Sequence, residues 1–230
     1  MRLVDLSQVF RSGMMSGTAD EAPEVAVRIR EVRSASRDGI NGMEIVLGNH
    51  AGTHIDAPLH VIPGGGTIGH LDLDLFFGPA VGLDVRKGDD APITVNDLER
   101  HGAIRAGDMV FLETGWSAYA GSPRYRDHHP YVDQEAARWL VRRHVRAVGI
   151  DASSLDMPRA IRPAGFRHDT LRIILGAGIP AIHGLTNLAA IRGHRCTAAA
   201  FPVIFEGSDA GPARVVAILE SSEPTGERTR

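Results

Sequence analysis

One short segment of the chain gathers side chains that commonly bind metal ions. Within eleven residues, His-Ala-Gly-Thr-His-Ile-Asp-Ala-Pro-Leu-His brings together His50, His54, Asp56 and His60. Imidazole nitrogen and carboxylate oxygen together suit zinc, and also manganese or iron, and three protein ligands leave positions open for water or substrate. An isolated histidine is usually a surface or packing residue, but four such groups at this spacing favour a site. The segment therefore predicts a catalytic metal centre.

The other residues of the segment shape its backbone. Gly52 lies between the first two histidines, where the absence of Cβ lets the chain turn so that both rings converge. Pro58 is expected to stiffen the exit. The preceding strand pattern ends near Leu47, so we expect the ligands to lie on a loop anchored by a sheet, which is a common place for reactive groups.

Composition narrows the kind of partner. The chain has 230 residues, 43% of them hydrophobic and 23% charged, and a formal net charge of -3. Such a chain can bury a substantial core, and without a broad basic field it is not expected to bind nucleic acid or an anionic membrane. We therefore predict a small-molecule substrate.

The sequence also bears on location and redox chemistry. Its first ten residues lack the pattern of a secretory signal, and the longest apolar stretch, around residues 173–182, is about half a membrane span. These features predict a cytoplasmic protein without a membrane partner. Cys196 is the only cysteine, which excludes an internal disulfide and a cysteine-rich zinc site, and we expect it to be buried packing.

Hydrophobic periodicity predicts several strands. Apolar residues alternate at 25, 27 and 29, and again at 43, 45 and 47, which is the period of a strand with one buried face. These two strands are expected to pair. Further strand-like runs cover residues 80–85, 109–113, 145–150, 199–205 and 214–219.

Helical patterns lie between these strands. Thr94 and Asp97 resemble the N-terminal cap of a short helix. A longer helix is predicted over residues 133–144, and another from about His168 until Gly176 and Gly178 end it. Strands mixed with helices indicate an α/β protein with a mixed sheet and flanking helices. We predict a single domain over residues 1–220, followed by a polar C-terminal tail at 221–230.

The eleven-residue segment resembles a family signature. The pattern H-x-G-T-H-x-D-x-P-x-H is similar to that of the cyclase-like metal-dependent hydrolases, which include bacterial kynurenine formamidases, isatin hydrolases and proteins named polyketide cyclases. Asp5-Leu6-Ser7 and the segments 148–151 and 175–180 also resemble family landmarks. The resemblance implies an α/β fold of the swivelling β/β/α kind, assembled as a homo-dimer or homo-tetramer.

The resemblance also implies roles for the residues of the segment. His50, His54 and Asp56 correspond to the metal ligands, and His60 corresponds to the proton donor and acceptor. In members with two metals, Asp56 would bridge the ions and His60 would touch the second one. The ion is expected to be Zn²⁺, with Mn²⁺ as the alternative.

The second metal site of the family is incomplete in this sequence. Its further ligands, a histidine and a glutamate twelve residues apart, correspond here to Leu171 and His183. Leucine cannot bind metal, so we predict a single-metal centre. His168, one helical turn before Leu171, could partly substitute. His183 could bind substrate, or it could simply fill space beside the loop.

These assignments predict a hydrolase that resembles the arylformamidases. A divalent ion would acidify a bound water to a pKa of roughly 7 and polarise a carbonyl group. The predicted reaction is hydrolysis of a carbon–nitrogen amide bond, as in a formamide or cyclic amide, or of a lactone, with His60 transferring the proton. One alternative is a metal-dependent cyclase or lyase acting on a polyketide-like substrate. Another is a metal-binding protein without catalysis.

The substrate is less clearly indicated. The family's formamidases tend to have early aromatic residues, whereas this chain has Met14 and Met15 there, which suits an apolar ligand without defining it. Four later aromatic residues are candidates for lining a pocket or for packing in the core. They are Phe76, Phe77, Trp116 and Tyr119.

Overall fold

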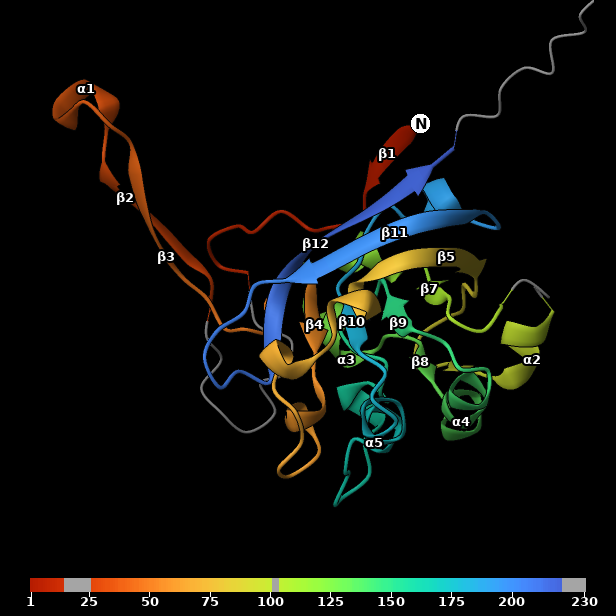
Figure 1. Cartoon of the computed structure of the whole chain (residues 1–230). Helices are drawn as coiled ribbons and strands as arrows, with labels where there is room; N and C mark the ends of the chain where they lie inside the picture. Colours follow the sequence, from red (N-terminus) through yellow and green to blue (C-terminus); the bar gives the residue numbers. More distant parts are fainter. Residues whose placement is uncertain (15–25, 101–103, 221–230) are drawn as a thin grey trace, which may run out of the picture.

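A mixed sheet that closes on itself forms the centre of the protein (Figure 1). The computed structural model describes residues 1–14, 26–100 and 104–220. The strand order is β1-β12-β11-β5-β7-β9-β10-β4, and β12 pairs with β4 as well, so that the sheet becomes a barrel. The strands are β1 (Arg2–Asp5), β4 (His54–Asp56), β5 (Phe77–Asp84), β7 (Met109–Glu113), β9 (Ala147–Ile150), β10 (Ala181–His183), β11 (Arg195–Pro202) and β12 (Ala210–Leu219).

Parallel and antiparallel pairs share this sheet. The consecutive strands β5, β7, β9 and β10 are parallel, whereas β4, β11, β12 and β1 join through antiparallel pairs. All residues of β7 and β9 are buried, as expected for parallel strands that are covered on both faces. The predicted α/β class with a mixed sheet is confirmed.

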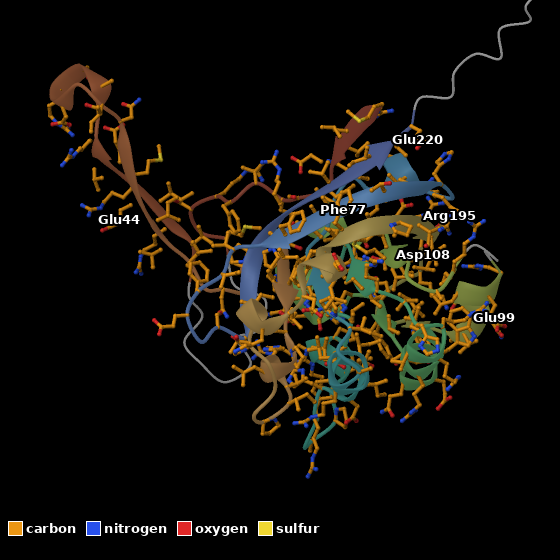
Figure 2. All side chains as sticks on the ribbon, in the orientation of Figure 1. Glu44, Phe77, Glu99, Asp108, Arg195 and Glu220 are labelled. Atoms are coloured by element: carbon orange, nitrogen blue, oxygen red, sulfur yellow. The ribbon has the colours of Figure 1, made fainter. Side chains whose placement is uncertain are left out.

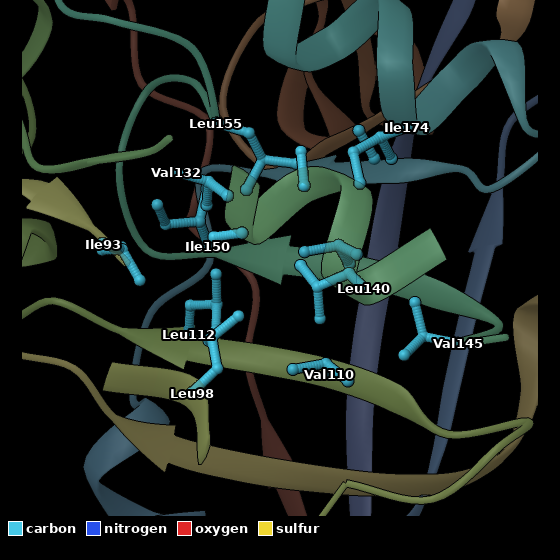
Figure 3. Packing of buried hydrophobic residues seen from close by; sticks show 14 of the residues in the cluster. Ile93, Leu98, Val110, Leu112, Val132, Leu140, Val145, Ile150, Leu155 and Ile174 are labelled. Atoms are coloured by element: carbon cyan, nitrogen blue, oxygen red, sulfur yellow. The ribbon is translucent and has the colours of Figure 1, made fainter. Parts of the chain in front are cut away.

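Helices cover the outer face of the parallel strands. Figure 3 shows Leu140 of α4 (Gln134–Arg142) near Val110 and Ile150 of the sheet, within one buried apolar cluster. The helix begins where the sequence predicts, because the carboxylate of Asp133 accepts a hydrogen bond from the Ala136 N–H at 2.7 Å. A second apolar cluster, which includes Ile55, fills the inside of the barrel. Both faces of the central strands are therefore buried.

Two other predicted helices are present with different details. In α2 (Val95–Glu99), Thr94 is the N-cap and its N–H donates to Asp97 Oδ2 at 2.8 Å, which confirms the predicted cap. In α5 (Asp169–Gly176), His168 is the N-cap and has a left-handed backbone with φ of 56°. His168 therefore precedes the helix, and the expectation that it shares a helical face with Leu171 is wrong.

The hairpin formed by β2 (Arg28–Arg33) and β3 (Gly42–Val46) projects from the body of the protein, with α1 (Ala35–Asp38) at its tip (Figure 1). Glu44, labelled in Figure 2, lies on this hairpin. The two strands pair as predicted. In the first run Val27 is buried and Ile29 is half-buried, whereas the expectation of a buried face is wrong for the second run, in which Met43 is 63% and Ile45 is 56% exposed. Among the described residues, no second layer covers them. Val25, the first residue of the predicted pattern, lies outside the described residues.

Smaller elements complete the described chain. The strand predicted over 199–205 ends earlier, because β11 stops at Pro202. Val203 still donates its N–H to the Pro212 carbonyl of β12 at 2.8 Å. The predicted tail at 221–230 lies outside the described residues. None of the described helices combines the length and apolar character that a membrane span needs. The remaining elements are η1 (Pro58–His60), η2 (Ile68–His70), η3 (Leu73–Phe76), β6 (Pro92–Ile93), η4 (Trp116–Tyr119), α3 (Pro123–Asp127), β8 (Tyr131–Val132), η5 (Arg159–Ile161) and η6 (Leu188–Ile191).

Candidate metal centre

The predicted ligands His54 and Asp56 lie on a strand of the barrel. The sequence predicts a loop here, which is wrong, because β4 is held between β10 and β12. All three residues of β4 are buried. Since side chains alternate along a strand, His54 and Asp56 share one face, while Ile55 joins the apolar cluster on the other. The barrel therefore fixes both donor side chains.

A tight turn brings His50 to the same face. Gly52 has φ of 58°, and a Cβ at this position would lie 3.0 Å from Cε1 of Phe10, so the turn favours glycine as predicted. The Gly52 carbonyl lies 2.9 Å from Nδ1 of His54 and accepts its proton. The lone pair of the neutral His54 ring is then on Nε2. That atom is buried and has no hydrogen-bond partner among the described residues.

Two further metal-donor atoms lie beside this unpartnered nitrogen, one from Asp56 and one from His50. Oδ1 of Asp56 lies 3.0 Å from Nδ1 of His50 and 3.5 Å from Nε2 of His54. Ligand atoms around a tetrahedral zinc ion are about 3.4 Å apart when each bond is about 2.1 Å. The spacing and chemistry of these three groups therefore fit a divalent cation, and they form one of the metal-ligating clusters of the described residues.

Asp209 also lies at this site, although no sequence pattern predicts it. It directly precedes β12, whose first residue, Ala210, pairs with Asp56 of β4. Its Oδ2 lies 3.0 Å from Nε2 of His50 and 2.8 Å from Nδ1 of His60. In the sequence, Asp209 follows glycine and serine and resembles an ordinary turn residue. Only strand pairing brings it to the histidines.

Asp209, His50 and His60 also form a possible metal-ligating cluster. This second donor set and the first one both need His50. A neutral imidazole has a single lone pair, so His50 cannot serve as a ligand in both sets at once. The orphaned Nε2 of His54 favours the set that contains His54 and Asp56.

His60 lies at the end of η1, which starts at Pro58, and faces both carboxylates. Its Nδ1 contacts Asp209, and its Nε2 is 3.8 Å from Oδ2 of Asp56. One ring nitrogen is thus held, while the other lies next to the predicted ligands. This position suits proton transfer at the edge of the metal centre.

The protonation states of the cluster favour cation binding. Burial raises the pKa of Asp56, but the adjacent histidines outweigh it and hold that pKa well below its usual range. Burial lowers the pKa of His54 to about 4, so its ring is neutral. For His50, burial lowers the pKa, but the carboxylates of Asp56 and Asp209 raise it to about 10. A cation bound through His50 must therefore displace a proton, which makes binding pH-dependent.

The residues at the family's second metal site belong to neither donor cluster of the described residues. Leu171 is buried in the outer apolar cluster. His183 pairs with His54 across β10 and β4; its Nδ1 is 3.4 Å from Oδ2 of Asp56, and its Nε2 accepts the Leu155 N–H at 3.4 Å. Burial lowers the pKa of His183 to about 3. His183 thus packs against the carboxylate as a neutral ring.

His168 is held by a different carboxylate. Its Nδ1 is 3.1 Å from Oδ2 of Asp156, and its ring centre is 6.5 Å from that of His60. Asp156 also accepts the Thr170 N–H at 3.0 Å, so it holds this loop. The structure places His168 near the site, but outside both donor clusters.

A cavity of about 270 Å³ opens beside His50 and His54. Its wall combines apolar surface from Met14 with polar groups, while Met15 lies outside the described residues. Phe76 and Trp116 are buried in the core, and Phe77 is 48% exposed. The other lining residues are Gln8, Gly13, Gly52, Gly121, Ser122, Pro123, Tyr125, Arg126, Ser153 and Gly184.

Two imidazoles and one carboxylate beside a cavity define the class of a metal-dependent hydrolase site. Comparison with known proteins agrees with this class. Residues 4–157 match the Cyclase family, described as "Putative cyclase". This match covers more than half of the chain, and the protein belongs to this family.

Individual relatives match almost the whole chain. A kynurenine formamidase from Geobacillus thermodenitrificans is 28% identical over 214 residues, which is 92% of this chain and 94% of the relative. Isatin hydrolase A from Ralstonia solanacearum is 27% identical with a TM-score of 0.81, covering 95% of this chain and 92% of that one. A predicted metal-dependent hydrolase from Bacillus stearothermophilus is 31% identical with a TM-score of 0.72, covering 94% and 97%.

Proposed function

We propose that this protein is a metal-dependent hydrolase that cleaves the carbon–nitrogen bond of a small formamide or cyclic amide. The observation that carries the proposal is the convergence of His50 Nδ1, the unpartnered His54 Nε2 and Asp56 Oδ1 beside a cavity. The kynurenine formamidase and isatin hydrolase relatives, whose names denote amide hydrolysis, support the same reaction.

The side chains have different roles in the proposed reaction. His50, His54 and Asp56 would hold the ion, which supplies Lewis acidity and lowers the pKa of water to about 7 when bound. His60 is fixed through Nδ1, so its Nε2 accepts the proton of the attacking water and delivers it to the leaving nitrogen. The buried position of the donors limits access to the side of the cavity.

Finer properties extend this proposal. Two nitrogens and one oxygen suit Zn²⁺ first and Mn²⁺ second. Because both donor sets need His50, we propose one ion for each chain. Assembly into a homo-dimer or homo-tetramer, a cytoplasmic location and the single domain over residues 1–220 stay predictions.

The proposed reaction is tested on the purified full chain, stripped of metal with EDTA and reloaded with Zn²⁺ or Mn²⁺. Formyl-anilides, cyclic imides and lactones are offered in ¹⁸O-labelled water. We expect metal-dependent turnover of amides, with solvent oxygen in the carboxylate product. His128→Asn, which removes a partly exposed histidine outside the donor sets, is the matched control and retains this activity.

Two results contradict the proposal, and each supports one alternative. Ring closure or elimination without label in the product indicates a cyclase or lyase that uses the same donors. Bound metal without turnover of any substrate class indicates a metal-binding protein without catalysis.

A further inference from the structure

Asp209 joins two histidines that have different tasks in the proposed reaction. Its Oδ2 lies 3.0 Å from Nε2 of His50 and 2.8 Å from Nδ1 of His60. The other oxygen, Oδ1, accepts a hydrogen bond from Nδ2 of Asn49 at 2.7 Å. The backbone carbonyl of Asp209 accepts the Ala57 N–H at 2.8 Å. The carboxylate is therefore held in place, with one oxygen directed at both rings.

These contacts select a tautomer in each ring. An ionised carboxylate only accepts hydrogen bonds, so each nitrogen that faces it carries a proton. A proton on one nitrogen of a neutral imidazole leaves the lone pair on the other. Nδ1 of His50 also faces a carboxylate oxygen, Oδ1 of Asp56 at 3.0 Å, so the lone pair of His50 is on Nδ1 once a cation has displaced the proton between these two atoms. That of His60 is on Nε2, 3.8 Å from Oδ2 of Asp56.

We propose that Asp209 is a positioning residue that sets both tautomers, so that His50 presents Nδ1 to a divalent cation while His60 presents Nε2 for proton transfer. The inference rests on the proposed function. Outer carboxylates commonly orient a ligand histidine in this way, and their loss typically weakens metal binding 10- to 100-fold.

The competing role for Asp209 is that of a direct ligand, together with His50 and His60. That arrangement uses Nε2 of His50 and leaves the buried Nε2 of His54 without any partner. A buried nitrogen without a partner is unfavourable. The positioning role satisfies all of these groups.

The test compares metal-free Asp209→Ala with the unmodified protein by Zn²⁺ titration against a competing chelator. We expect binding to be about 10- to 100-fold weaker. Nitrogen-15 NMR of the zinc-loaded proteins supplies a readout of tautomers. His60 should carry its proton on Nδ1 in the unmodified protein, and on Nε2 in the variant, as a free imidazole prefers.

Two further variants sharpen this comparison. Asp209→Asn keeps an acceptor oxygen but loses the charge, so a smaller loss of affinity is expected. Asp90→Asn alters another Asp–His pair, in which Asp90 Oδ2 is 3.2 Å from Nδ1 of His128. It should bind Zn²⁺ with unchanged affinity.

Several outcomes overturn the inference. Unchanged affinity and an unchanged His60 tautomer in Asp209→Ala reject it while leaving the proposed function intact. Complete loss of binding in Asp209→Ala, with normal binding in His54→Ala, makes Asp209 a direct ligand. If Asp209→Ala does not fold, unchanged Zn²⁺ affinity in Asp209→Asn rejects the inference instead. An unmodified protein that binds no Zn²⁺ or Mn²⁺ overturns both the inference and the proposed function.

Discussion

Strands β3 and β4 follow one another in the chain but have opposite surroundings. In the part of the chain that the structure describes, β3 pairs only with β2, and its Met43 and Ile45 are 63% and 56% exposed. β4 lies between β10 and β12, and all of its residues are buried. The comparison teaches that neighbouring strands, more than the local pattern, determine whether a strand is buried. Burial lowers the pKa of His54 on β4, whereas the adjacent histidines lower the pKa of Asp56 against the effect of burial.

Removing one carboxylate from β4 and one from β3 should produce the largest difference in bound metal and turnover. Asp56→Ala is expected to lose bound metal and to reduce turnover to the level of EDTA-treated protein, because the anionic ligand is gone. Glu44→Ala, on the exposed β2–β3 hairpin, removes only a surface ion pair with Arg30 and should retain both bound metal and turnover. Elemental analysis and turnover measure the effect. Retained metal in Asp56→Ala would count against the assignment.

His60 should contribute to turnover without being needed for metal binding. His60→Ala is expected to keep its ion and to lose about 10²- to 10⁴-fold in turnover, which is the usual contribution of a general acid–base group. Steady-state kinetics and metal analysis on the same sample separate the two effects, with His128→Asn as control. Unchanged turnover would remove His60 from the mechanism.

The same substitution on both strands tests the difference in burial. Ile55→Ala creates a cavity in the barrel and is expected to lower the free energy of unfolding by about 2–5 kcal/mol. Ile45→Ala, on the exposed β2–β3 hairpin, should change the free energy of unfolding by less than about 0.5 kcal/mol. Chemical denaturation measures both. A decrease of more than about 1 kcal/mol in the free energy of unfolding for Ile45→Ala would mean that the β2–β3 hairpin is covered in solution.

His129 tests how burial of a histidine outside the donor clusters makes the free energy of unfolding depend on pH. Burial lowers the pKa of His129 to about 4, from an ordinary value of 6.5. Between these values the unfolded chain binds the proton first, so the stability that is present above pH 6.5 is lost as the pH falls. The slope is at most about 1.4 kcal/mol per pH unit for one group.

His129→Asn should reduce this slope, because Asn cannot titrate yet can still donate to the Pro130 carbonyl, which accepts from Nδ1 of His129 at 2.9 Å. Denaturation at pH 7, 6, 5 and 4 measures the slope in the metal-free protein. Part of it should remain, since burial also lowers the pKa of His54 and His183. Identical slopes in both proteins would contradict the assignment to His129.

Local patterns were sufficient for much of the fold. The buried run at Met109–Glu113 became β7 with the predicted bounds, because a continuous apolar run suits a parallel strand covered on both faces. The helix predicted over residues 133–144 likewise became α4, and the structure shows Asp133 as its N-cap. The exposed side of β3 was not predictable, since alternation alone does not say whether another layer packs there.

Only some residues of the candidate site could be predicted from the sequence. His50, His54, Asp56 and His60 lie close together in the sequence, so their types and spacing predicted a shared centre. Asp209 comes from the other end of the chain and reaches them through the pairing of β12 with β4. Hydrophobic periodicity does not specify which distant strands pair. The left-handed backbone of His168, which keeps it off α5, was also without a sequence signal.

The most direct test of the account is a crystal structure of the protein loaded with Zn²⁺ or Mn²⁺, with anomalous data collected at the absorption edge of that metal. We expect one anomalous peak, about 2.0–2.2 Å from Nδ1 of His50, Nε2 of His54 and a carboxylate oxygen of Asp56. A map without a peak there, or with its only peak between His60 and Asp209, would contradict it.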